Sequence, residues 1–564
     1  MSTPMRLTTA FARLCPKRET LRFAGILLGL GGLSTLALPP VHCLPVLLLT
    51  FGALGLILNA TQSWKRAAWA GALFGFGFYA AGLYWLVYAV LIRADEFWWF
   101  VPFPSLGCAL ILAPTVAAPA ALCCLLPAGI RRLSAFAALW TLFDMGRTFI
   151  FSGFTWNALG SSLAVPGPVG SLLIQPAAWI GEDGLTLALV LLASLCGAIW
   201  LEPTVLARWI YLQTGANHTP APSLPDLRKR VFVCSVSGVL LWCVAGNVRL
   251  SSTHPTGEPG PIAIMVQGNV PETEKIGRQS PRDIFMRYLR LTAEGVHHAQ
   301  ALQASLNKPG EHFRPIVFLW PETAFPGYDL LQDSPHARQI IMQWATGADA
   351  GIIGALRMDD SGHYRNSVIA LAPDGAMEAV YDKARLVPFG EYQPPFIPLQ
   401  IVPQGGMAAG PGPQTWHLAD IPAVGPLICY EVIFSGDVVN SHDRPRWLAN
   451  VTNDAWFGNS AGPRQHLSSV RLRAVEEGLP VARAANTGIS VAYDGLGHMI
   501  DHLGWGKTGV LVTALPASLP PTLFGRFGQS IPLALCGLLL LLAGVPRRPA
   551  TRQSVAPSQK TTMH

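Results

Sequence analysis

Eight apolar runs, most of them long enough to cross a bilayer, constrain the fold of this chain more than any other feature of its 564 residues. A transmembrane helix needs about 20 mostly apolar residues, because lipid leaves its backbone groups no other hydrogen-bond partners. The hydrophobic fraction of 51%, the charged fraction of 13% and the mean hydropathy of +0.36 indicate a polytopic membrane protein. The expected helices lie within residues 23–38, 41–60, 67–90, 100–126, 133–151, 176–201, 231–247 and 529–545.

Basic residues in the short loops predict the orientation. They fall on the same side as the basic N-terminus, whereas the opposite short loops hold little more than Arg93. Because basic loops stay in the cytoplasm, both termini are expected there, and the segment between the seventh and eighth helices outside it. This placement accounts for the net charge of +7, so no nucleic-acid partner is expected. The loop residues are Lys65, Arg66, Arg131, Arg132, Arg208, Arg228, Lys229, Arg230, Arg547 and Arg548.

The hydropathy pattern divides the chain into five parts. These are a basic N-terminus at 1–22, a membrane domain at 23–248, an extracytoplasmic domain at 249–528, a last helix at 529–545 and a disordered tail at 546–564. In the extracytoplasmic domain short β-type runs alternate with amphipathic helical patterns, which predicts an α/β fold with buried sheets. Strands are expected at 262–266, 316–320, 351–355, 367–371, 424–428 and 447–451, and helices at 283–302, 336–344 and 466–477.

Cys429 is the only one of the ten cysteines that lies in this long polar segment. It ends an apolar run and is followed by Tyr430 and Glu431, a setting in which a lone thiol is a candidate nucleophile. The alternative is a small buried apolar residue, which is the usual role of a free cysteine.

A carboxylate and an ammonium follow other predicted strands. Glu322 comes just after the run 316–320, and Lys383 lies in a loop before Cys429. A thiol needs a base to take its proton or a cation to favour its thiolate, and an ammonium can stabilise a tetrahedral oxyanion. Taken singly, a surface glutamate and a surface lysine are the commoner explanations. Cysteine-mediated acyl transfer needs a side chain of each of these three types.

The motifs around these residues resemble the nitrilase, or carbon–nitrogen hydrolase, superfamily. They are WPETAFPG at 320–327, DKARLVPFGEY at 382–392, LICYE at 427–431, NDAWFG at 453–458 and RAANTG at 483–488. A domain of this kind between the last two of eight helices, opening with VQGN at 266–269, is similar to the apolipoprotein N-acyltransferase branch. The resemblance implies a nitrilase-like αββα sandwich.

By that resemblance, Cys429 accepts an acyl chain from a membrane phospholipid as a thioester. It then passes the chain to the N-terminal amine of a diacylglyceryl-cysteine on an apolipoprotein, in a ping-pong sequence. Glu322 is expected to be the general base and acid, and Lys383 the oxyanion partner. Glu391 is expected to support the site by holding Lys383.

The resemblance assigns less direct roles to the neighbouring residues. Tyr430 and Glu431 are expected to shape the pocket or to satisfy buried backbone groups. Phe389, Trp456 and Phe457 either line an acyl-chain path or fill the core. Two departures from the family's pattern have no functional interpretation: Ile276 stands where a tryptophan is usual, and the stretch 298–313 is longer than usual.

The expected enzyme is a monomer integral to the bacterial inner membrane, with its catalytic domain on the periplasmic side and with no metal or cofactor. One alternative is a membrane-tethered amidase that uses the same three residues. The other is a transporter or receptor with an inactive nitrilase-like sensing domain. That alternative requires functional charges within the helices, where Asp144, Arg147, Glu182 and Asp183 are the main ones.

The loop charges generate a test of the topology. Reporter fusions after Arg66, Arg132 and Arg230 should give cytoplasmic signals, and a fusion near Gly310 should give an extracytoplasmic signal. A cytoplasmic signal at Gly310 would contradict both the orientation and the expected access to periplasmic substrates.

Overall fold

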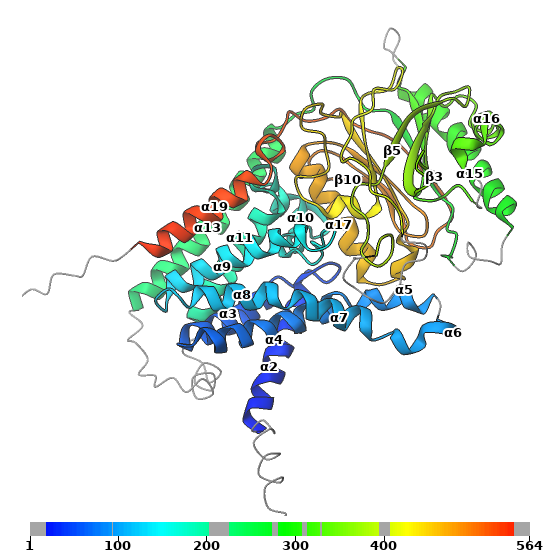
Figure 1. The fold of residues 1–564 in the computed structure, drawn as a ribbon. Coiled ribbons are helices and arrows are strands. Elements are labelled where there is room, and N and C mark those ends of the chain that lie inside the picture. The colour runs from blue at the N-terminus through cyan, green and yellow to red at the C-terminus, as the bar shows by residue number, and fades with distance from the viewer. Residues whose placement is uncertain are drawn as a thin grey trace, which may run out of the picture.

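A computed structural model describes residues 18–92, 94–201, 225–272, 280–306, 313–326, 330–393 and 406–545. Helices from the first half of the chain, together with the last helix at Ser530–Gly544, form one part of the molecule, and two sheets with their covering helices form the other (Figure 1). The tail at 546–564, most of the basic N-terminus, Ile276 and residues 307–312 of the long stretch 298–313 lie outside the described residues. The five predicted domain boundaries remain predictions.

The helical part contains ten helices of eight residues or more among the described residues, and shorter helical turns join them. The long ones are α2 (Arg18–Ser34), α3 (Pro45–Ala60), α4 (Trp64–Gly82), α7 (Phe103–Leu112), α8 (Pro114–Cys123), α9 (Ile130–Gly146), α10 (Gly167–Ile174), α11 (Ala177–Leu201), α13 (Pro225–Ser252) and α19 (Ser530–Gly544). The short ones are η1 (Thr35–Ala37), η2 (Tyr84–Leu86), α5 (Val87–Leu91), α6 (Ala94–Phe97), η3 (Trp98–Phe100), η4 (Arg147–Phe149) and η5 (Leu159–Leu163).

All eight predicted apolar runs are helical, but they are not equally suited to crossing a membrane. By length and composition the spans Thr20–Ala37, Trp98–Cys123, Ala177–Leu201 and Lys229–Ser252 qualify. The run at 67–90 is bent by 51° between Trp64–Gly82 and Tyr84–Leu91, and counts as a fifth if the pair is one span. Pro45–Ala60 and Ser530–Gly544 are shorter apolar helices. The protein therefore has several membrane-type helices, and the number eight remains a prediction.

The second part consists of two sheets. The order of the first is β11-β1-β2-β3-β4-β5, and that of the second is β10-β9-β8-β7-β6. The strands are β1 (Ile262–Gln267), β2 (Ile316–Trp320), β3 (Ala350–Met358), β4 (Tyr364–Leu371), β5 (Met377–Asp382), β6 (Val424–Ile428), β7 (Trp447–Thr452), β8 (Val481–Ala485), β9 (Ser490–Tyr493), β10 (Met499–Leu503) and β11 (Gly509–Ala514). All six predicted strands are confirmed. The sequence prediction missed β5, β8, β9, β10 and β11.

Helices cover the outer face of each sheet. Alternate residues of β1 and β2, such as Met265 and Leu319, join Ile428 in a core between the sheets. The other faces of those strands pack against α15 (Pro281–Leu306) and α16 (Pro335–Trp344). The outer face of the second sheet packs against α17 (Ala461–Glu477), in a core that continues into the helical part. The result is the expected αββα sandwich, and its three predicted helices are confirmed.

Helix α17 separates the second sheet from the membrane-type helices (Figure 1). Its N-terminus is capped by Ser460, whose hydroxyl accepts the backbone N–H of Gly462 at 3.1 Å. Its C-terminus ends at Gly478, which has the left-handed φ of 66° that glycine adopts without steric cost. Residues next to the helix therefore define both of its ends. Most side chains of the helix are buried.

Buried charges join α17 to α11. Arg473 donates to the carboxylate of Glu182 at 2.6 Å and pairs with Glu476 at 2.8 Å. Glu182 follows Gly181, whose φ of 67° interrupts α11 and leaves the Glu182 backbone N–H free to donate to Glu476 at 2.7 Å. Burial raises the pKa of Glu476 to about 8, although the Arg473 guanidinium opposes that shift. The charges at 182 and 183 thus lie at a helix break and in an interface.

Replacing Arg473 by leucine should destabilise the whole protein. The substitution leaves buried carboxylates without their cation, and breaking a buried pair in this way costs about 3–5 kcal/mol. Arg464→Leu, on the same helix but partly exposed, is the matched control. Thermal unfolding in detergent should show a lower midpoint for Arg473→Leu alone. Equal midpoints for the two variants would contradict the structural role of this pair.

Candidate active site

Cys429 sits in a strained turn directly after β6. It begins the short helix η8 (Cys429–Ile433) with a φ of +47°, a conformation that costs a non-glycine residue about 1–3 kcal/mol. Neighbouring side chains hold the turn. The Glu431 carboxylate accepts the Ile428 backbone N–H at 2.8 Å, and the Tyr430 hydroxyl donates to the Gly153 carbonyl at 2.5 Å. The thiol is therefore fixed at the carboxyl end of a parallel strand, where catalytic groups usually lie.

Glu322 lies just past the end of β2, the corresponding position in the other sheet. Its Oε1 accepts from the Asn366 amide at 2.8 Å and from the Lys383 ammonium at 3.0 Å. Its Oε2 accepts the backbone N–H of Asn453 at 2.9 Å. This buried carboxylate lies near enough to the candidate nucleophile for its charge to act on the Cys429 thiol.

Lys383 and Glu391 complete the buried charge cluster. The Lys383 ammonium, which is 1% exposed, donates to Glu391 at 2.8 Å as well as to Glu322. Asn366, in β4, donates to both carboxylates, with a distance of 2.7 Å to Glu391. The second oxygen of Glu391 accepts the Val387 backbone N–H at 2.8 Å. Glu391 therefore holds Lys383, the geometry that the sequence resemblance implied.

The pKa directions define the resting charges. Burial alone raises the pKa of Glu322, but the charge of Lys383 and the hydrogen bonds outweigh it and leave that pKa below its usual value. Burial lowers the pKa of Lys383, but the two glutamates raise it well above its usual range. Burial and the Glu322 charge raise the pKa of Cys429. The resting site therefore holds a carboxylate, an ammonium and a neutral thiol.

Glu431 ties the Cys429 turn to the loop that carries Lys383. Its Oε1 accepts from the Tyr381 hydroxyl at 2.6 Å and from the Ala384 backbone N–H at 2.7 Å. This geometry matches the second of the two roles expected for Glu431, the satisfaction of buried backbone groups. Tyr430, which bonds Gly153, instead fastens the turn to the helical part of the chain.

The sequence analysis missed a second buried cluster. His466 Nε2 lies 2.9 Å from the Cys429 carbonyl oxygen, and its Nδ1 lies 2.9 Å from Asp454. Arg483 pairs with the other Asp454 oxygen at 2.8 Å. Burial raises the pKa of Asp454, but Arg483 and His466 reverse that effect and lower it to about 2. Asp454 and Arg483 stand in two of the motifs noted above, so their positions, though not their contacts, were visible in the sequence.

This cluster also contains atoms of metal-binding type. Ligand atoms of Cys429, Asp454 and His466 all lie within 4.8 Å of one another. However, the Arg483 guanidinium lies 3.1 Å from His466 Nδ1 and forms an ion pair with Asp454. The positive charge of Arg483 therefore already neutralises the Asp454 carboxylate. The arrangement fits a structural ion pair better than a metal site.

The three aromatic side chains proposed for substrate binding differ in their surroundings. Phe389 stacks edge-on against Phe151, with ring centroids 5.8 Å apart. Phe457 packs edge-on against Trp85 at 4.8 Å, as part of a core. Trp456 is 39% exposed. The packing of Phe457 favours the core-filling alternative for that residue.

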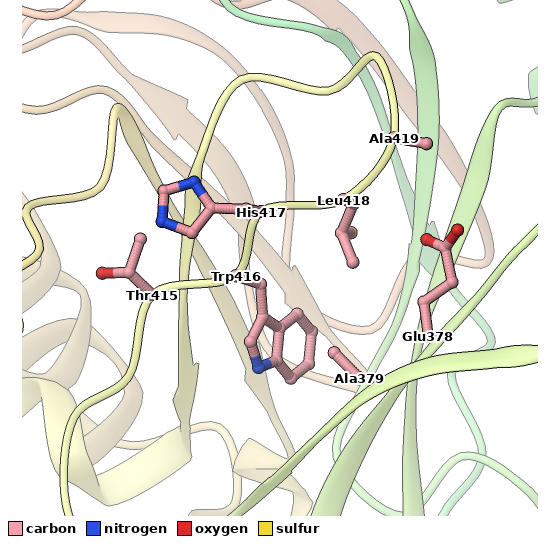
Figure 2. Close-up of a pocket in the computed structure, with 7 residues that line it drawn as sticks. All are labelled: Glu378, Ala379, Thr415, Trp416, His417, Leu418 and Ala419. Carbon is pink, nitrogen blue, oxygen red and sulfur yellow. The ribbon is translucent and has the colours of Figure 1, made fainter.

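A surface hollow of about 550 Å³ lies between β5 and the loop 415–419 (Figure 2). None of its lining residues belongs to the Glu322–Lys383–Cys429 cluster. A second hollow, of about 300 Å³, is lined by Arg385, the stretch 410–413 and Glu431, and so lies beside the Lys383 loop. Residues 410–413 therefore form one wall of a hollow next to the site.

Residues 298–520 match the carbon–nitrogen hydrolase family, so the αββα sandwich is that of a nitrilase-like enzyme. Residues 30–195 match the family described as the apolipoprotein N-acyltransferase N-terminal domain. The chain belongs to the apolipoprotein N-acyltransferase family.

The relatives match over nearly the whole chain. An apolipoprotein N-acyltransferase of Rhodopseudomonas palustris is 34% identical, over 92% of this chain and 94% of its own. One of Bradyrhizobium diazoefficiens is also 34% identical, over 93% and 94%. A solved amidase from Nesterenkonia sp. is 18% identical, with a TM-score of 0.33, over 47% of this chain and 94% of its own.

Replacing Lys383 by methionine should nearly abolish activity while keeping most of the side-chain bulk. Removal of one oxyanion donor typically lowers the rate by about a hundredfold to a thousandfold. Lys507→Met, at an exposed position of the same sandwich, is the control and should keep normal turnover. A folded Lys383→Met enzyme with near-normal turnover would remove Lys383 from the mechanism.

Proposed function

We propose that this protein transfers an acyl chain from a membrane phospholipid to the N-terminal amine of diacylglyceryl-cysteine on apolipoproteins, through a thioester on Cys429. The observation that carries the proposal is the buried cluster in which the Lys383 ammonium bonds the Glu322 carboxylate at 3.0 Å and the Glu322 charge acts on the Cys429 thiol. This arrangement supplies a base, a nucleophile and a cation in one place. Membership of the family supports the choice of substrates.

In the first half-reaction Glu322 takes the thiol proton as the sulfur attacks the ester carbonyl of the phospholipid. The negative charge that develops on the carbonyl oxygen is stabilised by the Lys383 ammonium and by the Tyr430 backbone N–H. The carbon–oxygen ester bond then breaks, and Glu322 returns the proton to the departing lysophospholipid oxygen. The products are a thioester on Cys429 and a lysophospholipid.

In the second half-reaction the neutral amine of the lipoprotein cysteine attacks the thioester carbonyl. Glu322 accepts a proton from the nitrogen, the carbon–sulfur bond breaks, and the proton passes to the Cys429 thiolate. An amide forms and the free thiol is restored. The same oxyanion donors serve both steps, which is the reason for expecting a ping-pong sequence.

The membrane-type helices support lipid substrates over the amidase alternative, because a soluble amide would need only one anchor. The buried charges support an enzyme over the sensor alternative, because Glu322, Lys383 and Cys429 are all present and in contact or close to one another. The proposed location is the bacterial inner membrane with the sandwich on the periplasmic side, in a monomeric protein.

The proposal predicts a stable acyl-enzyme. Purified protein mixed with phospholipids of different chain length should gain a mass that follows the donor chain. Hydroxylamine should remove the added mass, because it cleaves thioesters. The modified peptide should contain Cys429, and Cys429→Ser should gain no hydroxylamine-sensitive mass. The measurement is intact mass followed by peptide mapping.

The same experiment separates the alternatives. An amidase would lose the acyl group to water quickly, whereas a transferase should keep it until an amine acceptor is added. A competent preparation that gains no mass, or gains it at another residue, would contradict the proposed mechanism.

A further inference from the structure

His466 touches the backbone of the candidate nucleophile and has no part in the mechanism above. It is fully buried, near the start of α17, and its Nε2 lies 2.9 Å from the carbonyl oxygen of Cys429. A carbonyl oxygen only accepts hydrogen bonds, so Nε2 carries the hydrogen. His466 Nε2 is therefore the donor and the Cys429 carbonyl oxygen the acceptor of this hydrogen bond.

The carbonyl of Cys429 belongs to the same peptide unit as the N–H of Tyr430. In a planar trans peptide the C=O and the N–H point in opposite directions. A bond that holds the carbonyl on one side therefore directs the Tyr430 N–H to the other. That N–H follows the nucleophile, and it is the backbone donor assigned to the oxyanion above.

The His466 ring is itself held from several directions. The Arg483 guanidinium lies 3.1 Å from its Nδ1, where it can donate to the ring, and also donates to Asp454 at 2.8 Å. The preceding residue, Gln465, accepts hydrogen bonds from the indole N–H groups of Trp85 at 3.2 Å and Trp156 at 2.7 Å. The start of α17 is thus anchored to the helical part of the chain.

We propose that His466 is a positioning residue that aims the Tyr430 backbone N–H at the oxyanion of the acyl-transfer intermediates. The inference rests on the proposed role of Cys429 as nucleophile. It gives His466 no proton-transfer step, because its Nε2 hydrogen is committed to the carbonyl. The strained φ of +47° at Cys429 makes such support necessary, since the turn has easier conformations available.

Two polar substitutions test the proposal. In His466→Gln the amide nitrogen can reach the place of Nε2 and donate to the Cys429 carbonyl. In His466→Asn the shorter amide reaches only the place of Nδ1, beside Asp454. Each variant is measured for the rate of thioester formation with phospholipid and for the rate of iodoacetamide alkylation at Cys429. Alkylation displaces iodide from carbon and forms no oxyanion, so it reports the thiol alone.

We expect His466→Asn to form the thioester about a hundredfold more slowly, the typical cost of a lost oxyanion donor. Its alkylation rate at Cys429 should stay within about threefold of wild type, and His466→Gln should recover at least about a tenth of wild-type acylation, on the same scale of donor loss. His417→Asn is the matched control, because His417 also pairs with an aspartate, Asp443, but is exposed. It should change neither rate.

Three results would overturn the inference: equal loss of acylation and alkylation in a His466→Asn protein whose thermal midpoint is that of wild type, normal acylation in that variant, or no difference between the asparagine and glutamine variants. Thermal midpoints of both variants accompany the rates, so that unfolding is seen as a parallel loss of both activities. Failure of the wild-type protein to form a thioester would instead contradict the proposed function of Cys429.

Discussion

Burial of the Lys383 ammonium between two carboxylates is the constraint on which the site depends. A charge removed from water must find opposite charges and hydrogen bonds nearby, or folding becomes strongly unfavourable. Glu322 and Glu391 supply the charges, and Asn366 bonds to both carboxylates at 2.8 and 2.7 Å. These residues come from the end of β2, from β4 and from the loops after β5. The need to satisfy one ammonium therefore brings distant segments together around Cys429.

The helical part and the sandwich are joined at the Cys429 turn as well as at their edges. Gly153 accepts from Tyr430, the Thr155 hydroxyl donates to the Ile433 carbonyl at 3.2 Å, and the Ser152 hydroxyl donates to the Leu386 carbonyl at 2.5 Å. One short loop of the helical part thus contacts both the cysteine turn and the lysine loop. A rigid connection of this kind suits an enzyme whose substrates lie in lipid, because the reacting carbonyl and the thiol must meet at a fixed depth.

Buried polar groups at the interface explain charges that are unusual in membrane-type helices. Glu182 lies at the break in α11. Arg473 of α17 neutralises its carboxylate, and Glu476 of α17 accepts its backbone N–H. Asp144 pairs with Arg147, which also donates to the carbonyl oxygens of Phe154 and Trp156. Both pairs hold irregular backbone that would otherwise lack hydrogen bonds inside the protein. Their contacts are structural, which agrees with an enzyme rather than with a conduction path.

The sequence by itself determined the apolar helices, the α/β class and six strands, and its motifs singled out Glu322, Lys383, Glu391 and Cys429 as candidates, because hydropathy, strand periodicity and motif letters are local properties. It did not determine the bend after Gly82 or the five further strands, among them the exposed β10, whose residues carry no buried pattern. Only the tertiary structure decided that His466 would meet the Cys429 carbonyl across 37 positions of the chain. A hydrogen bond between distant segments depends on how α17 packs against the second sheet, and no spacing in the sequence records that packing.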